Sequence, residues 1–149
     1  ESKINIHFSY SIDADYIKNT TERITLYRQI LEADSYERIA EIKAELEDRY
    51  GRAPDSIEKI FFAGMIRVFA KKHQLEEVDL YLDQLVIKLP EDFAGELPLN
   101  RLTSSPAFKV NKSDDGTLWT FHFPDYKIFI NEISKFNFTT KGTKDTKER

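Results

Sequence analysis

Three histidines are the first candidates for acid–base or metal chemistry in this chain of 149 residues: His7, His73 and His122. His7 lies on the polar side of an alternating segment. His73 lies in the last turn of a predicted helix, where a cation stabilises the helix dipole. His122 alternates with the apolar residues of a predicted hairpin. No two of the three have the spacing of metal ligands, so the sequence predicts no catalytic or metal-binding histidine.

Other reactive groups show the same lack of convergence. The chain has no cysteine, which leaves neither disulfides nor thiolate chemistry, and its five glycines are scattered singly. No phosphate-binding loop and no Gly-x-Ser-x-Gly elbow is present. Carboxylates are common, but paired acids need burial to separate their pKa values, and most fall on solvated helix faces. We therefore expect no catalytic residue and no cofactor. A small hydrolase using acidic residues around the loop Asp13 to Asn19 is an alternative.

One polar pattern remains, on a helix predicted to end at Tyr50. At about 100° per residue, four acidic side chains fall within roughly 80° of one another, opposite the apolar stripe. They are Glu37, Glu41, Glu45 and Asp48. Like charges four residues apart cost about 0.2–0.5 kcal/mol per pair. This acidic face is either a solvated outer surface or a docking surface for arginines.

Composition limits the class of protein. Hydrophobic residues make up 40% of the chain and aromatic residues 13%, enough for one domain with a core that buries roughly two-thirds of the unfolded surface. The net charge of -4 disfavours nucleic-acid binding and suits a basic protein partner. No membrane span or signal peptide is evident, so a cytoplasmic location is the default expectation. Since a strand pattern begins close to Glu1, we interpret the chain as a fragment of a longer protein.

Periodicity predicts an α+β fold: an N-terminal strand, three amphipathic helices, then β-hairpins and a C-terminal helix in one compact domain over residues 1–138. Residues 139–149, rich in Lys and Thr, are predicted to form a flexible tail. The predicted elements are a strand with alternation from Ile4 to Ile12, helices starting at Thr20 or Thr21, Asp34 and Asp55, strands Val78 to Leu82 and Leu85 to Leu89, a hairpin about Asp114-Asp115-Gly116, and a helix from Tyr126 to Phe136.

Local signals mark the helix boundaries. Gly51 followed by Pro54 is a stop signal, with Gly51 expected in a left-handed conformation. Capping boxes are expected at Asp34 with Glu37 and at Asp55 with Glu58. Gly64 lies in the apolar stripe of the third helix. A glycine there costs about 1 kcal/mol relative to alanine, so we expect another element to approach it closely.

Two segments carry a family resemblance. Asp15-Tyr16-Ile17 followed by the segment Arg23 to Ile30, and then Glu41 to Gly51 with Pro54, resemble two signatures of the C-terminal domain of bacterial transcription-repair coupling factors. The resemblance runs from about Ile4 to Val78 and keeps the order and spacing of both signatures. The loop at 13–19 lacks two prolines that the family commonly has there.

The resemblance implies a regulatory role without catalysis. In this family the domain follows an ATP-driven DNA translocase that displaces stalled RNA polymerase. It is thought to fold back on a UvrB-like N-terminal region, where it masks the UvrA-binding surface and restrains the motor. Glu45 and Asp48 match the positions that would meet arginines, Glu41 lies one turn earlier, and Arg49 is the next residue of the signature. These four residues form the predicted protein interface. A generic protein-binding module of another multidomain protein is the alternative.

Overall fold

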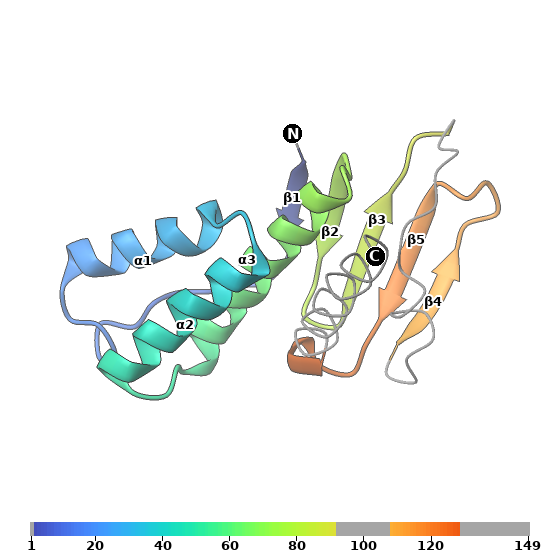
Figure 1. The fold of residues 1–149 in the computed structure, drawn as a ribbon. Helices are drawn as coiled ribbons and strands as arrows, with labels where there is room; N and C mark the ends of the chain where they lie inside the picture. Colours follow the sequence, from blue (N-terminus) through green and yellow to red (C-terminus); the bar gives the residue numbers. More distant parts are fainter. Residues whose placement is uncertain (1, 92–107, 129–149) are drawn as a thin grey trace, which may run out of the picture.

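The computed structural model describes residues 2–91 and 108–128. Figure 1 shows an α+β arrangement in which a strand and a group of helices precede most of the sheet. The elements are, in order, β1 (Lys3–Ile6), α1 (Thr20–Glu32), α2 (Tyr36–Tyr50), α3 (Asp55–Lys72), β2 (Glu77–Leu80), β3 (Gln84–Lys88), β4 (Lys109–Lys112) and β5 (Leu118–His122). The predicted fold class is confirmed.

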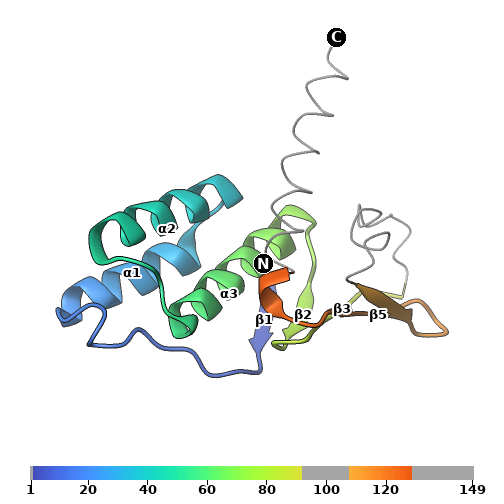
Figure 2. The same ribbon diagram turned by 90° about the horizontal axis from the view of Figure 1, so that it is seen from below.

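The five strands form one sheet in the order β1-β2-β3-β5-β4. β1 and β2 are parallel, and the other neighbouring pairs are antiparallel. A parallel pair needs a crossover connection, and α1, α2 and α3 together supply it. Seen from below, the helices lie on one side of the sheet, near its β1–β2 end (Figure 2).

β1 is shorter than the alternation predicted. It ends at Ile6, because its partner strand ends at Leu80, whose carbonyl accepts a last hydrogen bond from the His7 amide (2.8 Å). The apolar residues that continue the alternation to Ile12 still pack against the core, but without strand pairing. The alternation therefore marks burial correctly and overestimates the strand.

Both predicted hairpins are present. β2 and β3 pair in register with Leu80 opposite Leu85. β4 and β5 pair about the Asp114-Asp115-Gly116 turn, where Gly116 has a φ of 75°. Residues 126–128 are helical, which agrees with the start of the predicted last helix. The remainder of that helix and the predicted tail lie outside the described residues.

The residues that cap the first two helices each lie one residue or so from the predicted ones. Asn19, rather than Thr20 or Thr21, caps α1, and Ser35, rather than Asp34, caps α2; each side chain accepts from a backbone amide three residues on (3.0 Å in both). Both capping residues have the extended backbone that this position requires. α3 follows Pro54 without a side-chain cap, so the expected Asp55 box is absent.

The C-terminal end of α2 follows the predicted stop signal. Gly51 has a φ of 87°, and its amide donates to the Glu47 carbonyl (2.9 Å). The Glu47 side chain then accepts from the Ala53 amide (2.9 Å), so the turn into α3 is held from both sides. These two contacts fix how the chain passes from α2 into α3.

α3 is the centre of the core. Eleven of its residues are buried, including Phe62, Phe69 and Gly64. A Cβ added at Gly64 would lie 3.0 Å from the Ile30 carbonyl oxygen and 2.7 Å from Ile30 Cγ2. The close approach expected at Gly64 is therefore the crossing of α1 over α3. Among the described residues, no helix is both long and apolar enough to cross a membrane.

Candidate docking surface on the second helix

α2 presents two opposite faces. Its apolar face packs inward through four buried residues: Tyr36, Ile39, Ile42 and Leu46. Glu37, Glu41, Glu45 and Asp48, here called the acidic ridge, are all exposed on the other side. The ridge is therefore part of the solvent-facing surface and not of the domain's interior.

Two of the four ridge residues, Glu45 and Asp48, have no cation of their own within the described residues. Arg38 pairs with Glu41 at 3.2 Å across one helical turn, and both side chains are largely exposed (40% and 64%), so the pair is weak. Within residues 2–91 and 108–128, Glu45 and Asp48 take part in no ion pair or side-chain hydrogen bond. Two carboxylates of the predicted interface thus remain available to an external cation.

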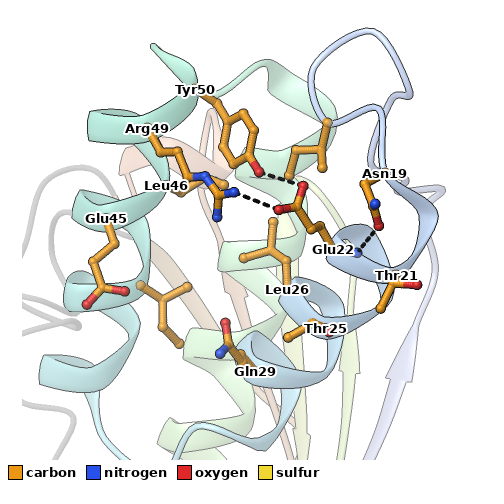
Figure 3. Close-up of a pocket in the computed structure, with 12 residues that line it drawn as sticks. Asn19, Thr21, Glu22, Thr25, Leu26, Gln29, Glu45, Leu46, Arg49 and Tyr50 are labelled. Carbon is orange, nitrogen blue, oxygen red and sulfur yellow. Dashed lines mark hydrogen bonds and ion pairs between the residues drawn. The ribbon is translucent and has the colours of Figure 1, made fainter.

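Arg49, the fourth predicted interface residue, has a partner within the chain. Its guanidinium lies 2.7 Å from one Glu22 carboxylate oxygen and 5.0 Å from the Tyr50 ring centre. The Tyr50 hydroxyl donates to the other Glu22 oxygen (2.9 Å). Two effects raise the pKa of Tyr50: desolvation is the larger, and the hydrogen bond to Glu22 is the second. Arg49 therefore ties α2 to α1 (Figure 3).

A groove of about 500 Å³ lies between α1 and α2. Figure 3 shows Glu45 and Arg49 on its α2 side and Thr25 and Gln29 on its α1 side. Four buried apolar residues line it: Ile17, Leu26, Ile42 and Leu46. Sequence reasoning missed this groove. One sequence pattern could have indicated the groove: uncharged polar residues recur at one-turn spacing on α1, at Thr21, Thr25 and Gln29.

The two signature segments contact each other directly. The Tyr16 hydroxyl, from the first segment, donates to the carbonyl of Gly51 in the second (2.6 Å). Arg23 donates to the carbonyls of Ile17 and Lys18 (2.6 and 2.9 Å), which holds the loop against the start of α1. These signature residues therefore position α1 and α2 relative to the loop, while the acidic ridge faces outward.

The histidines do not form a reactive cluster. His7 lies 3.2 Å from Asp79 and stacks on Tyr81, with ring centres 4.4 Å apart. Burial opposes ionisation of Asp79, but hydrogen bonds from neighbours including His7 outweigh it and lower the pKa of Asp79. Burial lowers the pKa of His73. The described part of the chain holds no group of three or more His, Cys, Asp or Glu side chains that could bind a metal.

The acidic loop of the hydrolase alternative contributes to no such group within the described residues. Asp13 and Asp15 are exposed. The Asp13 carbonyl accepts hydrogen bonds from the amides of Tyr16 and Ile17 (3.1 Å each), which makes this segment a turn that leads into α1. The loop's visible role is to bring the chain from β1 to the helices.

Comparison with known proteins assigns the family. The TRCF domain model matches residues 6–96, which is more than half of the chain. The chain belongs to the TRCF domain family. Among curated relatives, this TRCF domain is 24% identical over 92 residues to the transcription-repair-coupling factor of Myxococcus xanthus, covering 62% of the chain. It is 28% identical over 110 residues to that of Borreliella burgdorferi, covering 74% of the chain.

A solved structure has the same fold. The crystal structure of the C-terminal domain of a transcription-repair coupling factor aligns with a TM-score of 0.70 at 17% identity, covering 98% of this chain and 96% of that one. By contrast, this TRCF domain spans only 8–9% of the length of its curated relatives. The match thus concerns one domain of those much longer proteins, and the resemblance noted in the sequence is confirmed.

Proposed function

We propose that this TRCF domain is the non-catalytic C-terminal regulatory domain of a transcription-repair coupling factor. Its acidic ridge docks on a basic, UvrB-like N-terminal region of the same polypeptide. In that docked state it masks the surface that recruits UvrA and restrains the ATP-driven DNA translocase. Engagement of stalled RNA polymerase by the parent protein then releases the domain. The domain itself contacts neither nucleic acid nor membrane in this scheme.

One observation carries the proposal: Glu45 and Asp48 are exposed on a well-anchored helix and have no cation of their own within the described residues. Lys43, on another side of the same helix, is already paired with Glu58 of α3 at 2.8 Å. The unpaired negative charge is therefore concentrated where a partner can reach it. Charges arranged in this way favour a cationic partner and reject an acidic one.

A weak interface is sufficient to keep the domain docked on the N-terminal region, an arrangement here called the latch. A tethered domain meets its partner at an effective concentration of about millimolar, so a few charge pairs hold it closed. To move the latch from roughly 1:99 to 99:1, a ligand must prefer the open form by about 5.5 kcal/mol. Binding of polymerase to the parent protein is the step that supplies this preference.

The test is charge reversal in the full-length parent protein. Glu45→Arg combined with Asp48→Arg is expected to raise basal ATPase activity and UvrA binding, because the ridge then repels the basic region. The matched control is Asp13→Arg with Asp15→Arg, which changes the net charge equally at exposed positions that do not belong to the ridge. The control should retain wild-type activity.

Two outcomes would contradict the proposal. If the ridge variant folds but keeps wild-type ATPase activity and UvrA binding, the ridge does not act as a latch. If both charge-reversed variants raise activity equally, the cause is total charge and not the ridge. Salt provides an independent check, because a charge-based interface should weaken between low ionic strength and about 0.15 M.

A further inference from the structure

The groove between α1 and α2 shares a residue with the acidic ridge. Glu45 belongs to both, since it lies on the exposed side of α2 and also on the groove's rim (Figure 3). Any partner that pairs with Glu45 must therefore cover at least part of the groove. Its lining is apolar at the bottom and polar at the rim, which is the usual composition of a binding pocket.

The charges around the groove do not cancel, because one carboxylate has no cationic partner. Glu22 and Arg49 both line it, and they neutralise each other at 2.7 Å. Arg49 is also one helical turn from Glu45, a spacing at which Glu and Arg commonly pair. Because Arg49 reaches across to α1 instead, Glu45 is left as the one unbalanced charge among the groove's lining residues. The groove thus suits an apolar group carried beside a cation.

We propose that this groove receives an aliphatic side chain from a cationic segment of the docking partner. The side chain enters between Leu26 of α1 and Leu46 of α2, while a neighbouring basic residue meets Glu45. This inference rests on the proposed docking of the ridge and adds α1 to the interface. The ridge then selects a basic partner, and the groove selects the apolar residue at a fixed place beside the basic one.

Thr25 is the residue through which the groove can be filled without altering the ridge. It is exposed on the rim, so Thr25→Trp should leave the fold intact and occupy the space. In the full-length parent we expect this variant to raise the ratio of undocked to docked domain about tenfold, as loss of one buried aliphatic side chain from the interface would. Basal ATPase activity and UvrA binding should rise together. Thr25→Ala, which leaves the groove empty, should behave as wild type.

The results separate this inference from the proposed function. If Thr25→Trp behaves as wild type while the Glu45 and Asp48 reversal opens the latch, the groove is not used and the ridge proposal stands. If neither variant opens the latch, both proposals fail. If Thr25→Ala opens it as much as Thr25→Trp does, the effect belongs to the threonine side chain, and the groove proposal is wrong.

Thiol labelling, followed on the peptide that contains residue 25, tests coverage of the groove directly, and this chain contains no cysteine of its own. Thr25→Cys should react with iodoacetamide about tenfold more slowly in the parent than in this chain alone, since docking covers it. Arg28→Cys, exposed on the outer side of α1, should react equally in both. Equal rates for Thr25→Cys would overturn the inference. So would slowing that appears in this chain alone as its concentration rises, because the occupant would then be a second copy.

Discussion

Gly64→Ala is the substitution whose effect can be worked out most directly from the structure. The new Cβ would lie 2.7 Å from Ile30 Cγ2, 3.0 Å from the Ile30 carbonyl oxygen and 3.1 Å from Ile39 Cδ1. Ile30 is fully buried and Ile39 nearly so. The side-chain atoms can shift slightly, but the carbonyl oxygen belongs to the backbone of α1. α1 itself must therefore move away from α3.

Two free-energy terms oppose each other. Alanine improves helix propensity at an interior position by about 1 kcal/mol. Overpacking of a tight core costs about 1–3 kcal/mol, and a contact with backbone belongs in the upper part of that range. We expect Gly64→Ala to lower the free energy of unfolding by about 1–2 kcal/mol in net terms. That corresponds to a fall in Tm of about 3–8 °C for a domain of this size.

Urea denaturation measures the change, with Ala44→Gly as the control. Ala44 is exposed in the middle of α2, so its replacement reports the propensity term alone, about 1 kcal/mol. In the double variant Gly64→Ala with Ile30→Leu, the branch methyl is gone, and part of the loss should be recovered. If Gly64→Ala is as stable as wild type while Ala44→Gly shows its expected cost, the packing argument is refuted.

Other predictions concern a turn, a titration and an ion pair. Gly51→Ala should lower the free energy of unfolding by about 1–3 kcal/mol, from backbone strain alone: φ is 87°, ψ is -175° and no atom lies within 4 Å of the added Cβ. Urea denaturation checks this, and an unchanged midpoint would contradict it. Hydrogen bonds from the Thr117 side chain and amide hold the pKa of Asp115 at about 2. The stabilisation is present above the unfolded pKa of about 3.9 and disappears as the pH falls through 2. A carboxyl NMR titration midpoint near 4 would be inconsistent with these bonds. Glu22→Gln should cost less than about 1 kcal/mol, because the pair with Arg49 is exposed. A larger loss in thermal unfolding would mean that this pair is a main support of the α1–α2 contact.

Elements with a regular apolar spacing or a distinctive turn sequence were predictable from the sequence. The apolar stripe of α2 predicts its buried residues, and the Asp114-Asp115-Gly116 turn predicts the β4–β5 hairpin. Gly64 also predicts the close approach of another element, which in the structure is α1. In each case the physical cause is local: a repeating face, or a residue whose backbone freedom is needed at that position.

Features that depend on a distant partner were not predictable. β1 ends at Ile6 because β2 ends at Leu80, more than seventy residues later in the chain. The parallel pairing of these two strands has no local signature either. The N-caps were missed for another reason: Asn19 and Ser35 stand next to other good capping residues, and only the backbone conformation distinguishes them.

The same distinction between local and distant causes applies to the candidate site. That Glu45 and Asp48 face outward follows from helical periodicity. That Arg49 pairs with Glu22, and so leaves Glu45 unneutralised, depends on how α1 packs against α2. The groove has the same origin. Sequence alone thus predicts which charges are exposed, and packing decides which of them are still available to a partner.

The stability of α2 does not depend on Glu45 or Asp48. The helix is held by the Ser35 cap, the Gly51 stop, its buried stripe and ion pairs to α1 and α3 through Arg49 and Lys43. Glu45 and Asp48 contribute to none of these contacts, and each adds repulsion with its acidic neighbours. Charge reversal there should leave the free energy of unfolding nearly unchanged or slightly increased. A functional change in such a variant can therefore be assigned to the interface and not to unfolding of the domain.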